Sequence, residues 1–139
     1  MTFEELEQTL PNGFHDARIL ALSLDNLDRT LTIKLSLHVS VEGDGDRERY
    51  RIASLGAHSV CLFFMESPDP NYHFLFDGRG IAASGASVAL GQDSLIDPLL
   101  RKLPPGVTAY RFFLDDWNSF LYLAANDVSL SWERGDQPS

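Results

Sequence analysis

The chain has 139 residues, of which 44% are hydrophobic and 22% are charged. This length and composition are typical of one globular domain, which we expect to span residues 1–134 with a loose C-terminal tail at 135–139. The net charge of -9 argues against a nucleic-acid partner, because a phosphate backbone would be repelled. No apolar run approaches the roughly 18 residues that a membrane-spanning helix needs.

The N-terminal segment is acidic where a secretory signal would be basic. The single cysteine, Cys61, cannot form an internal disulfide, and its apolar neighbours predict a buried thiol. We therefore expect a soluble, cytoplasmic protein.

A short amphipathic helix is the first predicted element. Thr2 and Glu5 fit a capping box, in which their side chains bond backbone amides of the first turn. Leu6 and Leu10 share one face of this helix. The turn-forming segment 11–13 then ends it.

The clearest strand pattern covers residues 30–41, where apolar residues occupy every second position. These residues are Leu31, Ile33, Leu35, Leu37, Val39 and Val41. A period of two predicts a long strand with one face in water. The apolar run 19–24 connects to it through the polar loop 25–28, which favours an antiparallel hairpin.

Further strands are predicted in the rest of the chain, separated by turns. They cover residues 48–55, 59–65, 72–76, 81–90, 108–114, 120–125 and 128–133. Segment 81–90 reads as a weak edge strand, 93–103 as a short connecting helix, and Asn126–Asp127 as a hairpin turn. About eight short strands predict a mostly β fold, an antiparallel sandwich or curved barrel, with an α+β arrangement as the alternative.

His15 and Asp16 form the first candidate site. An imidazole beside a carboxylate, where a turn meets a strand, is an arrangement that can orient a general base. Adjacent residues of a strand point to opposite faces, however. The pattern therefore favours a structural role, in which these side chains bond backbone amides at the bend.

The second candidate site contains Asp115, Asp116, Trp117 and Asn118 in a loop between two predicted strands. Paired carboxylates can serve as acid and base, or bind a hard cation such as calcium. No further oxygen ligands follow at regular spacing. A hairpin turn with Trp117 on the rim of the core is therefore the favoured interpretation.

The potential ligands for a metal ion are scattered along the chain. The four histidines are His15, His38, His58 and His73, and none has a second ligand at the short spacings that zinc prefers. Segment 78–83 matches only a loose dinucleotide pattern and lies in no predicted βαβ unit. We expect no metal and no cofactor, and we assign no catalytic residue.

Residues 10–17, Leu-Pro-Asn-Gly-Phe-His-Asp-Ala, are followed by the alternating hairpin and later by 116–120, Asp-Trp-Asn-Ser-Phe. This arrangement resembles a family of small, uncharacterised bacterial proteins that open with a Phe-His-Asp-Ala segment. A similar opening occurs among proteins proposed as immunity proteins of bacterial toxin systems. The resemblance implies a cytoplasmic inhibitor that binds one toxin, and it transfers no catalytic residue.

Two functional hypotheses follow from these patterns. The leading one is a non-enzymatic protein-binding domain, immunity-like, whose acidic surface meets a partner with a basic surface. Acidic loop clusters also serve plain solubility. The alternative is a small-molecule-binding β-barrel, or a hydrolase that uses His15 with Asp16 or Asp116. The candidate binding residues are His15, Asp16, Asp115, Asp116, Trp117 and Asn118.

Overall fold

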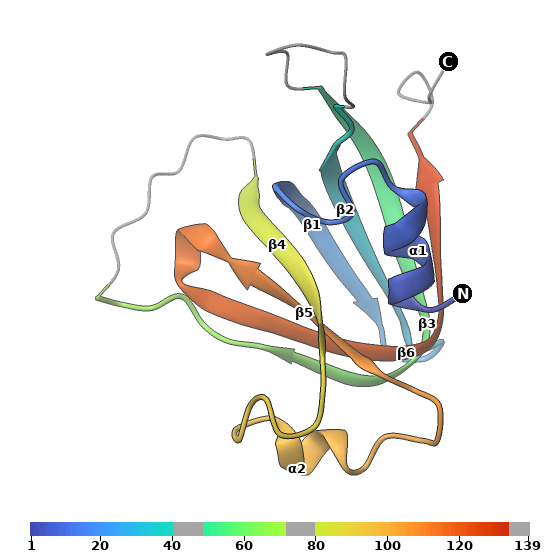
Figure 1. Ribbon diagram of the computed structural model, residues 1–139, viewed down its shortest axis with the longest axis vertical. Coiled ribbons are helices and arrows are strands. Elements are labelled where there is room, and N and C mark those ends of the chain that lie inside the picture. The colour runs from blue at the N-terminus through green and yellow to red at the C-terminus, as the bar shows by residue number, and fades with distance from the viewer. Residues whose placement is uncertain (41–48, 72–79, 134–139) are drawn as a thin grey trace.

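The computed structural model describes residues 1–40, 49–71 and 80–133. The elements along the chain are α1 (Phe3–Thr9), β1 (Ala17–Asp25), β2 (Thr30–His38), β3 (Tyr50–Met65), β4 (Ile81–Val88), α2 (Asp97–Leu100), β5 (Ala109–Leu114), the 3-10 helix η1 (Asp115–Trp117) and β6 (Ser119–Trp132). The strands close an antiparallel barrel in the order β1-β2-β3-β6-β5-β4 (Figure 1). The mostly β fold with a short N-terminal helix is confirmed, and it is a barrel. None of the described helices is long and apolar enough to cross a membrane.

The described residues form six strands because two pairs of predicted strands are in fact single long ones. Segments 48–55 and 59–65 were predicted as separate strands, yet both belong to β3. Gly56, between them, pairs with Thr32 of β2 and Ser129 of β6, so the backbone stays extended. The bend falls instead at Ser59, whose φ of 54° is left-handed.

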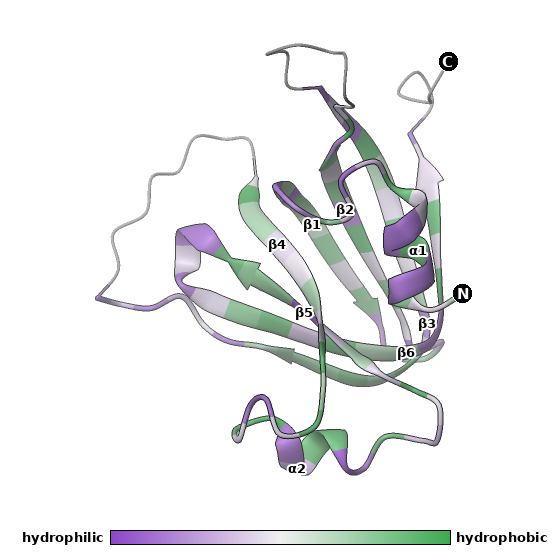
Figure 2. Cartoon of the chain, viewed as in Figure 1, coloured by the Kyte–Doolittle hydropathy of each residue, from purple (hydrophilic) through white to green (hydrophobic). Residues whose placement is uncertain are grey.

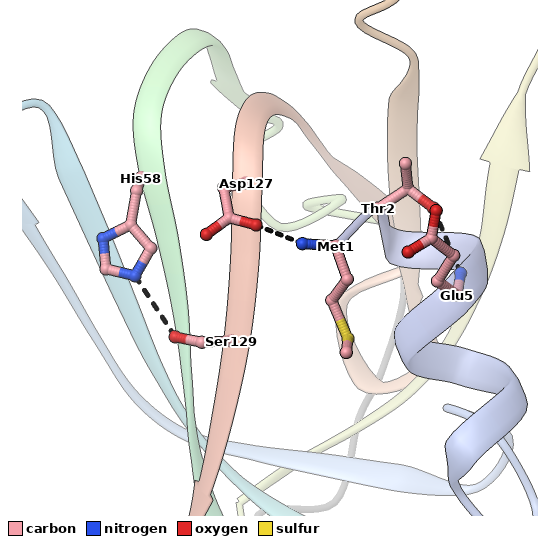
Figure 3. A network of polar contacts seen from close by, with 6 residues as sticks. All are labelled: Met1, Thr2, Glu5, His58, Asp127 and Ser129. Atoms are coloured by element: carbon pink, nitrogen blue, oxygen red, sulfur yellow. Dashed lines mark hydrogen bonds and ion pairs between the residues drawn. The ribbon is translucent and has the colours of Figure 1, made fainter.

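The predicted hairpin turn at Asn126–Asp127 is wrong, because both residues lie inside β6. Asp127 pairs with His58 across the sheet, and Ser129 Oγ lies 3.2 Å from His58 Nε2 (Figure 3). A register shift opposite this segment bends both strands without ending either. An Asn-Asp pair therefore sits at a bend of the barrel and not at a chain reversal.

Strand β4 is also not the edge strand that its small residues predicted. It pairs with β5 over residues 83–88 and with β1 over residues 81–83, which closes the barrel. The β1–β2 hairpin and the short α2 connector are confirmed. The predicted strand 72–76, Val41 and the tail at 135–139 lie outside the described residues.

The barrel interior is filled by apolar side chains at every second position. On β2, Leu31, Ile33, Leu35 and Leu37 are all buried, and hydropathy alternates along the strand (Figure 2). Burying one such side chain contributes roughly 1.5–3 kcal/mol. The predicted inner face of this strand is therefore confirmed for the positions that the structure describes.

Helix α1 covers part of this interior. Phe3 and Leu6 are buried, and the ring of Phe3 stacks on Tyr110 of β5 with centroids 4.7 Å apart. The absence of a side chain at Gly85 of β4 leaves room for Tyr110, whose ring atoms would lie 2.5 Å from an added Cβ. Burial, with the carboxylate of Glu7 nearby, raises the pKa of Tyr110 far above its ordinary value.

Polar contacts attach the start of α1 to β6 (Figure 3). The backbone N–H of Glu5 donates to Thr2 Oγ1 at 3.1 Å, which caps the helix. The ammonium group of Met1 pairs with Asp127, and the N–H of Val128 donates to the carbonyl of Met1 at 3.0 Å. The helix is thus held against the strand at its first turn.

The connection between β4 and β5, which contains α2, packs on the outside of the barrel near the bottom of the view in Figure 1. Ile96 is buried there among outward-facing side chains of the strands, including Tyr122. The hydroxyl of Tyr122 donates to Asp93 at 2.5 Å. Burial and this bond to a carboxylate raise the pKa of Tyr122 to about 12.

Candidate functional site

The fold brings the two predicted clusters together at one edge of the barrel. Residues 15–16 directly precede β1, and residues 115–116 directly follow β5. Strand β4 lies between them, because Ala83 pairs with Ala17 on one side and with Leu114 on the other. Segments a hundred residues apart in sequence are therefore separated by one strand.

The charged groups at this edge influence one another. His15 Nε2 lies 3.5 Å from Asp16 Oδ2, and Asp16 adopts a left-handed φ of 56°. Asp116 accepts a hydrogen bond of 3.0 Å from the N–H of Ala82. Burial raises the pKa of Asp115, the carboxylates of Asp116 and Asp16 raise it further, and His15 opposes them.

This edge contains a histidine and carboxylates that could form an acid–base couple, but His15 and Asp16 are not shielded from water. The side chains of His15 and Asp16 are 74% and 58% exposed, so water screens their interaction. No group of three or more His, Cys, Asp or Glu that could hold a metal ion occurs in the part of the chain that the structure describes. A catalytic role for His15 with Asp16 or Asp116 stays a prediction.

The polar contacts at the bend before β1 come chiefly from a neighbouring residue. Asn12 Nδ2 donates to the carbonyls of His38 and Ser40, at 3.0 and 2.7 Å. These bonds tie the bend to the end of β2. A structural role for the side chains of His15 or Asp16 at this bend stays a prediction.

Trp117 and Asn118 lie in the tight connection between β5 and β6, where Leu114 pairs with Ser119. Asn118 is left-handed, with φ 47°, and its amide donates to Asp69 at 3.0 Å. Trp117 is partly buried against the core. The predicted hairpin turn with a rim tryptophan is therefore confirmed.

A surface groove lies between α1 and the adjoining ends of β2, β3 and β6. Its volume is about 830 Å³, and we refer to it as the α1 groove. The helix and the turn after it contribute Leu6, Thr9, Leu10 and Pro11. The strands contribute Arg51, Val128, Leu130 and Trp132, and Val39 and Arg49 lie just beyond the ends of β2 and β3. None of the six predicted site residues lines this groove.

Strand register explains why arginines line an otherwise apolar groove. Arg51 pairs with Leu37, whose side chain is buried in the interior, so Arg51 occupies an inner-face position. Trp132 pairs with Ala53 on the same face of the sheet. The alternation that buries Ala53 and Leu55 therefore continues outward into a half-buried arginine.

Backbone hydrogen bonds fix this end of the barrel. The N–H of Val39 donates to the carbonyl of Arg49 at 2.8 Å, and that of Glu133 donates to Ile52 at 2.8 Å. The sequence carries a signal for this site, because Arg49 and Arg51 continue the every-second-residue pattern of Ala53 and Leu55.

Comparison of the chain with protein-family models, with curated proteins and with solved structures finds no match.

Proposed function

We propose that this protein is a non-enzymatic binding domain that holds a small apolar molecule in the α1 groove. The observation that carries the proposal is the size and lining of the groove. Its volume of about 830 Å³ lies within the range of small-molecule sites. Most of the lining side chains are aliphatic or aromatic, with a few polar groups among them. Such a lining gains free energy when an apolar ligand displaces water, at about 25 cal/mol per Å².

The walls of the groove support a preformed site. One wall is α1, which is capped by Thr2 and attached to β6 through Met1. The other wall consists of strands whose pairing is continuous from Leu31 to His38 and, next to the groove, from Ala53 to His58. Rigid walls reduce the entropy cost of binding, because little has to be ordered when the ligand enters.

Titration with the neutral fluorescent probe N-phenylnaphthylamine tests this proposal. The fluorescence of the probe should rise and saturate with one site per chain. Thr9→Trp places a bulky ring in the groove and should weaken binding at least about tenfold. Gln8→Trp is the matched control, since Gln8 is exposed on the same helix and does not line the groove. Equal binding by the two variants would contradict the proposal.

A protein-binding domain is the second candidate, and one exposed residue favours it. Leu27, between β1 and β2, is 95% exposed, and acidic Asp25 and Asp28 lie beside it. An apolar tip with carboxylates around it suits a partner with a basic surface. The resemblance of residues 10–17 to immunity proteins favours a toxin as that partner.

Affinity capture from bacterial cells that carry the genomic neighbours tests this second candidate. The chain should retain one specific basic protein, and Leu27→Ser should lose it. Leu95→Ser is the matched control, because Leu95 is 64% exposed far away in the sequence. If both variants retained the same protein, Leu27 would not be part of the binding interface.

A cytoplasmic location is part of both proposals. The lone thiol of Cys61 is half-buried and has no second cysteine with which to form a disulfide. Fractionation of the native cells, with the chain detected by antibody, tests the location.

A further inference from the structure

The edge of β6 that borders the α1 groove lacks a partner strand for part of its length. Strand β6 pairs with β3 up to Trp132, but with β5 only from Ser119 to Ala124. Past Ala124, no described strand pairs with the edge of β6 that faces away from β3. Four consecutive residues of β6, 127–130, line the groove. Because successive side chains of a strand point to opposite faces, such a run indicates that the groove borders the edge of the strand.

Hydrogen bonds show which backbone groups lie on this edge. The N–H of Glu133 donates to β3, whereas the N–H of Val128 donates to the carbonyl of Met1 on the opposite side of β6. Backbone N–H groups alternate in direction along a strand, so those of Leu130 and Trp132 point the same way as that of Val128. Neither has an acceptor among the described residues. Two backbone donors of the described chain therefore face the groove without a partner.

These donors favour an occupant that has a backbone of its own. Leu130 and Trp132 are both half-buried. An unpaired backbone group withdrawn from water costs free energy, and a strand edge with such groups is a template for a further strand. Met1 already uses this edge, since its carbonyl accepts the N–H of Val128 at 3.0 Å. A hydrocarbon ligand would leave the next two donors unpaired, whereas a second backbone supplies carbonyls at the same spacing, about 7 Å.

We propose that the ligand of the α1 groove is a short, extended peptide with apolar side chains at every second position, which adds a strand to the free edge of β6. Its carbonyls accept hydrogen bonds from Leu130 and Trp132, and its apolar side chains pack against α1. This inference rests on the proposed function of the groove and names the class of apolar molecule that it holds.

Helix α1 supplies the wall that these side chains meet, and it begins beside β6 at Met1 (Figure 3). Leu6 and Leu10 line the groove and are 3% and 8% exposed, so they form a recessed apolar surface. Every second side chain of an added strand points to the same side, which directs one set of side chains toward this surface. In strand addition, main-chain hydrogen bonds give affinity and the contacts of alternate side chains give specificity.

Displacement of N-phenylnaphthylamine by the pentapeptide acetyl-Val-Thr-Val-Thr-Val-amide tests this inference. Two further forms of the peptide are methylated, one at the valine nitrogens and one at the threonine nitrogens. Only one of these sets faces β6 in an added strand, because N–H groups alternate in direction. The unmodified peptide should displace the probe. One methylated form should bind at least about tenfold more weakly, and the other should bind within about threefold of the unmodified peptide.

A substitution in β6 tests the same hydrogen bonds from the side of the protein. Leu130→Pro removes the N–H that faces the groove, and proline is tolerated in an edge strand where its nitrogen faces no partner strand. Leu130→Ala is the matched control, since it shortens the same side chain and keeps the N–H. The peptide should bind to Leu130→Pro at least about tenfold more weakly than to Leu130→Ala. The methylated peptides give the same test on the natural chain if Leu130→Pro fails to fold.

Three outcomes would overturn the inference. Normal binding of the probe without displacement by any form of the peptide would refute the peptide and leave the proposed function of the groove standing. Equal displacement by all three forms would show that main-chain hydrogen bonds contribute nothing. A chain that sediments as a dimer until the probe is added would make a second copy of the chain the occupant.

Discussion

Two stretches of the same barrel face differ sharply in what they carry. In the middle of β3, Ala53 and Leu55 point into the interior and are fully buried. Two and four residues earlier, Arg51 and Arg49 continue the alternation and line the α1 groove instead. One strand period therefore serves two purposes, a packed interior and a hollow with charged groups.

The difference lies in what covers each stretch. Over the packed stretch, the side chains of neighbouring strands meet one another, as Leu35 of β2 and Ala53 of β3 do across the ladder. Over the hollow stretch, α1 stands opposite the strands and leaves about 830 Å³ unfilled. A groove of this size leaves apolar side chains in contact with water, which is typical of sites kept for a ligand.

Removing a side chain from the packed stretch should have the largest effect. Leu35→Ala should lower the free energy of unfolding by about 2–5 kcal/mol, because Leu35 is fully buried and the substitution leaves a cavity. Ser36→Ala, its half-buried neighbour on the other face, should change it by less than about 0.5 kcal/mol. Denaturant melts of both variants measure this. Similar losses in the two would show that both faces of β2 are covered.

Overfilling the packed interior should have the next largest effect. Gly85→Ala adds a Cβ about where the ring of Tyr110 lies, with the nearest ring atom at 2.5 Å. The ring must shift, and the strain should cost about 1–3 kcal/mol. Thermal melts measure the loss, with the adjacent Ser84→Ala as the control. A Gly85→Ala variant as stable as the natural chain would mean that Tyr110 has free space beside it.

Removing the N-terminal cap of α1 should have a smaller effect on stability, in the helix that forms one wall of the α1 groove. Thr2→Ala removes the acceptor for the Glu5 amide and should cost about 1 kcal/mol of stability. Thr2→Ser keeps the hydroxyl and should restore most of that loss. Chemical denaturation followed by circular dichroism distinguishes the two variants. Equal stability of the alanine and serine variants would show that the cap contributes nothing.

Removing a charge at the acidic edge of the barrel should raise stability, because negative charge is unfavourable at Asp115. The pKa of Asp115 is raised in the folded chain by burial and then by Asp116 and Asp16. A raised carboxyl pKa means that the folded state loses stability as pH rises through that pKa. Asp115→Asn should therefore stabilise the chain at neutral pH, by less than about 1 kcal/mol, because Asp115 is only slightly buried and water screens the neighbouring charges. The gain should fade as pH drops below the pKa of Asp115, and a variant less stable at neutral pH would contradict this.

Local patterns predicted the parts of the fold that local chemistry determines. The period of two from Leu31 to Leu37 located β2 and its buried face, and the capping residues Thr2 and Glu5 located α1. The end of a strand was harder to predict. Asn126–Asp127 has the composition of a turn but lies at a bend inside β6, because pairing with β3 holds the chain extended.

The candidate site divides in the same way. The sequence identified His15, Asp16, Asp115 and Asp116 as unusual, but only the closing of the barrel by β4 brings the two segments near each other. The α1 groove depends on the packing of a helix against a sheet end, which no single segment specifies. The spacing of Arg51 from Leu55 predicts that Arg51 lies on the inner face of the sheet. Arg51 lines a groove only because α1 lies opposite this end of the sheet.

The most direct test of the central claim uses the two tryptophans of the chain. Trp132 lines the α1 groove, whereas Trp117 packs at the connection between β5 and β6. Each gives one indole N–H signal in a nitrogen-15 correlation spectrum, and Trp117→Phe assigns them. Titration with N-phenylnaphthylamine should move the Trp132 signal in a saturable way and leave that of Trp117 in place. Movement of the Trp117 signal alone, or of neither signal, would contradict binding in the groove.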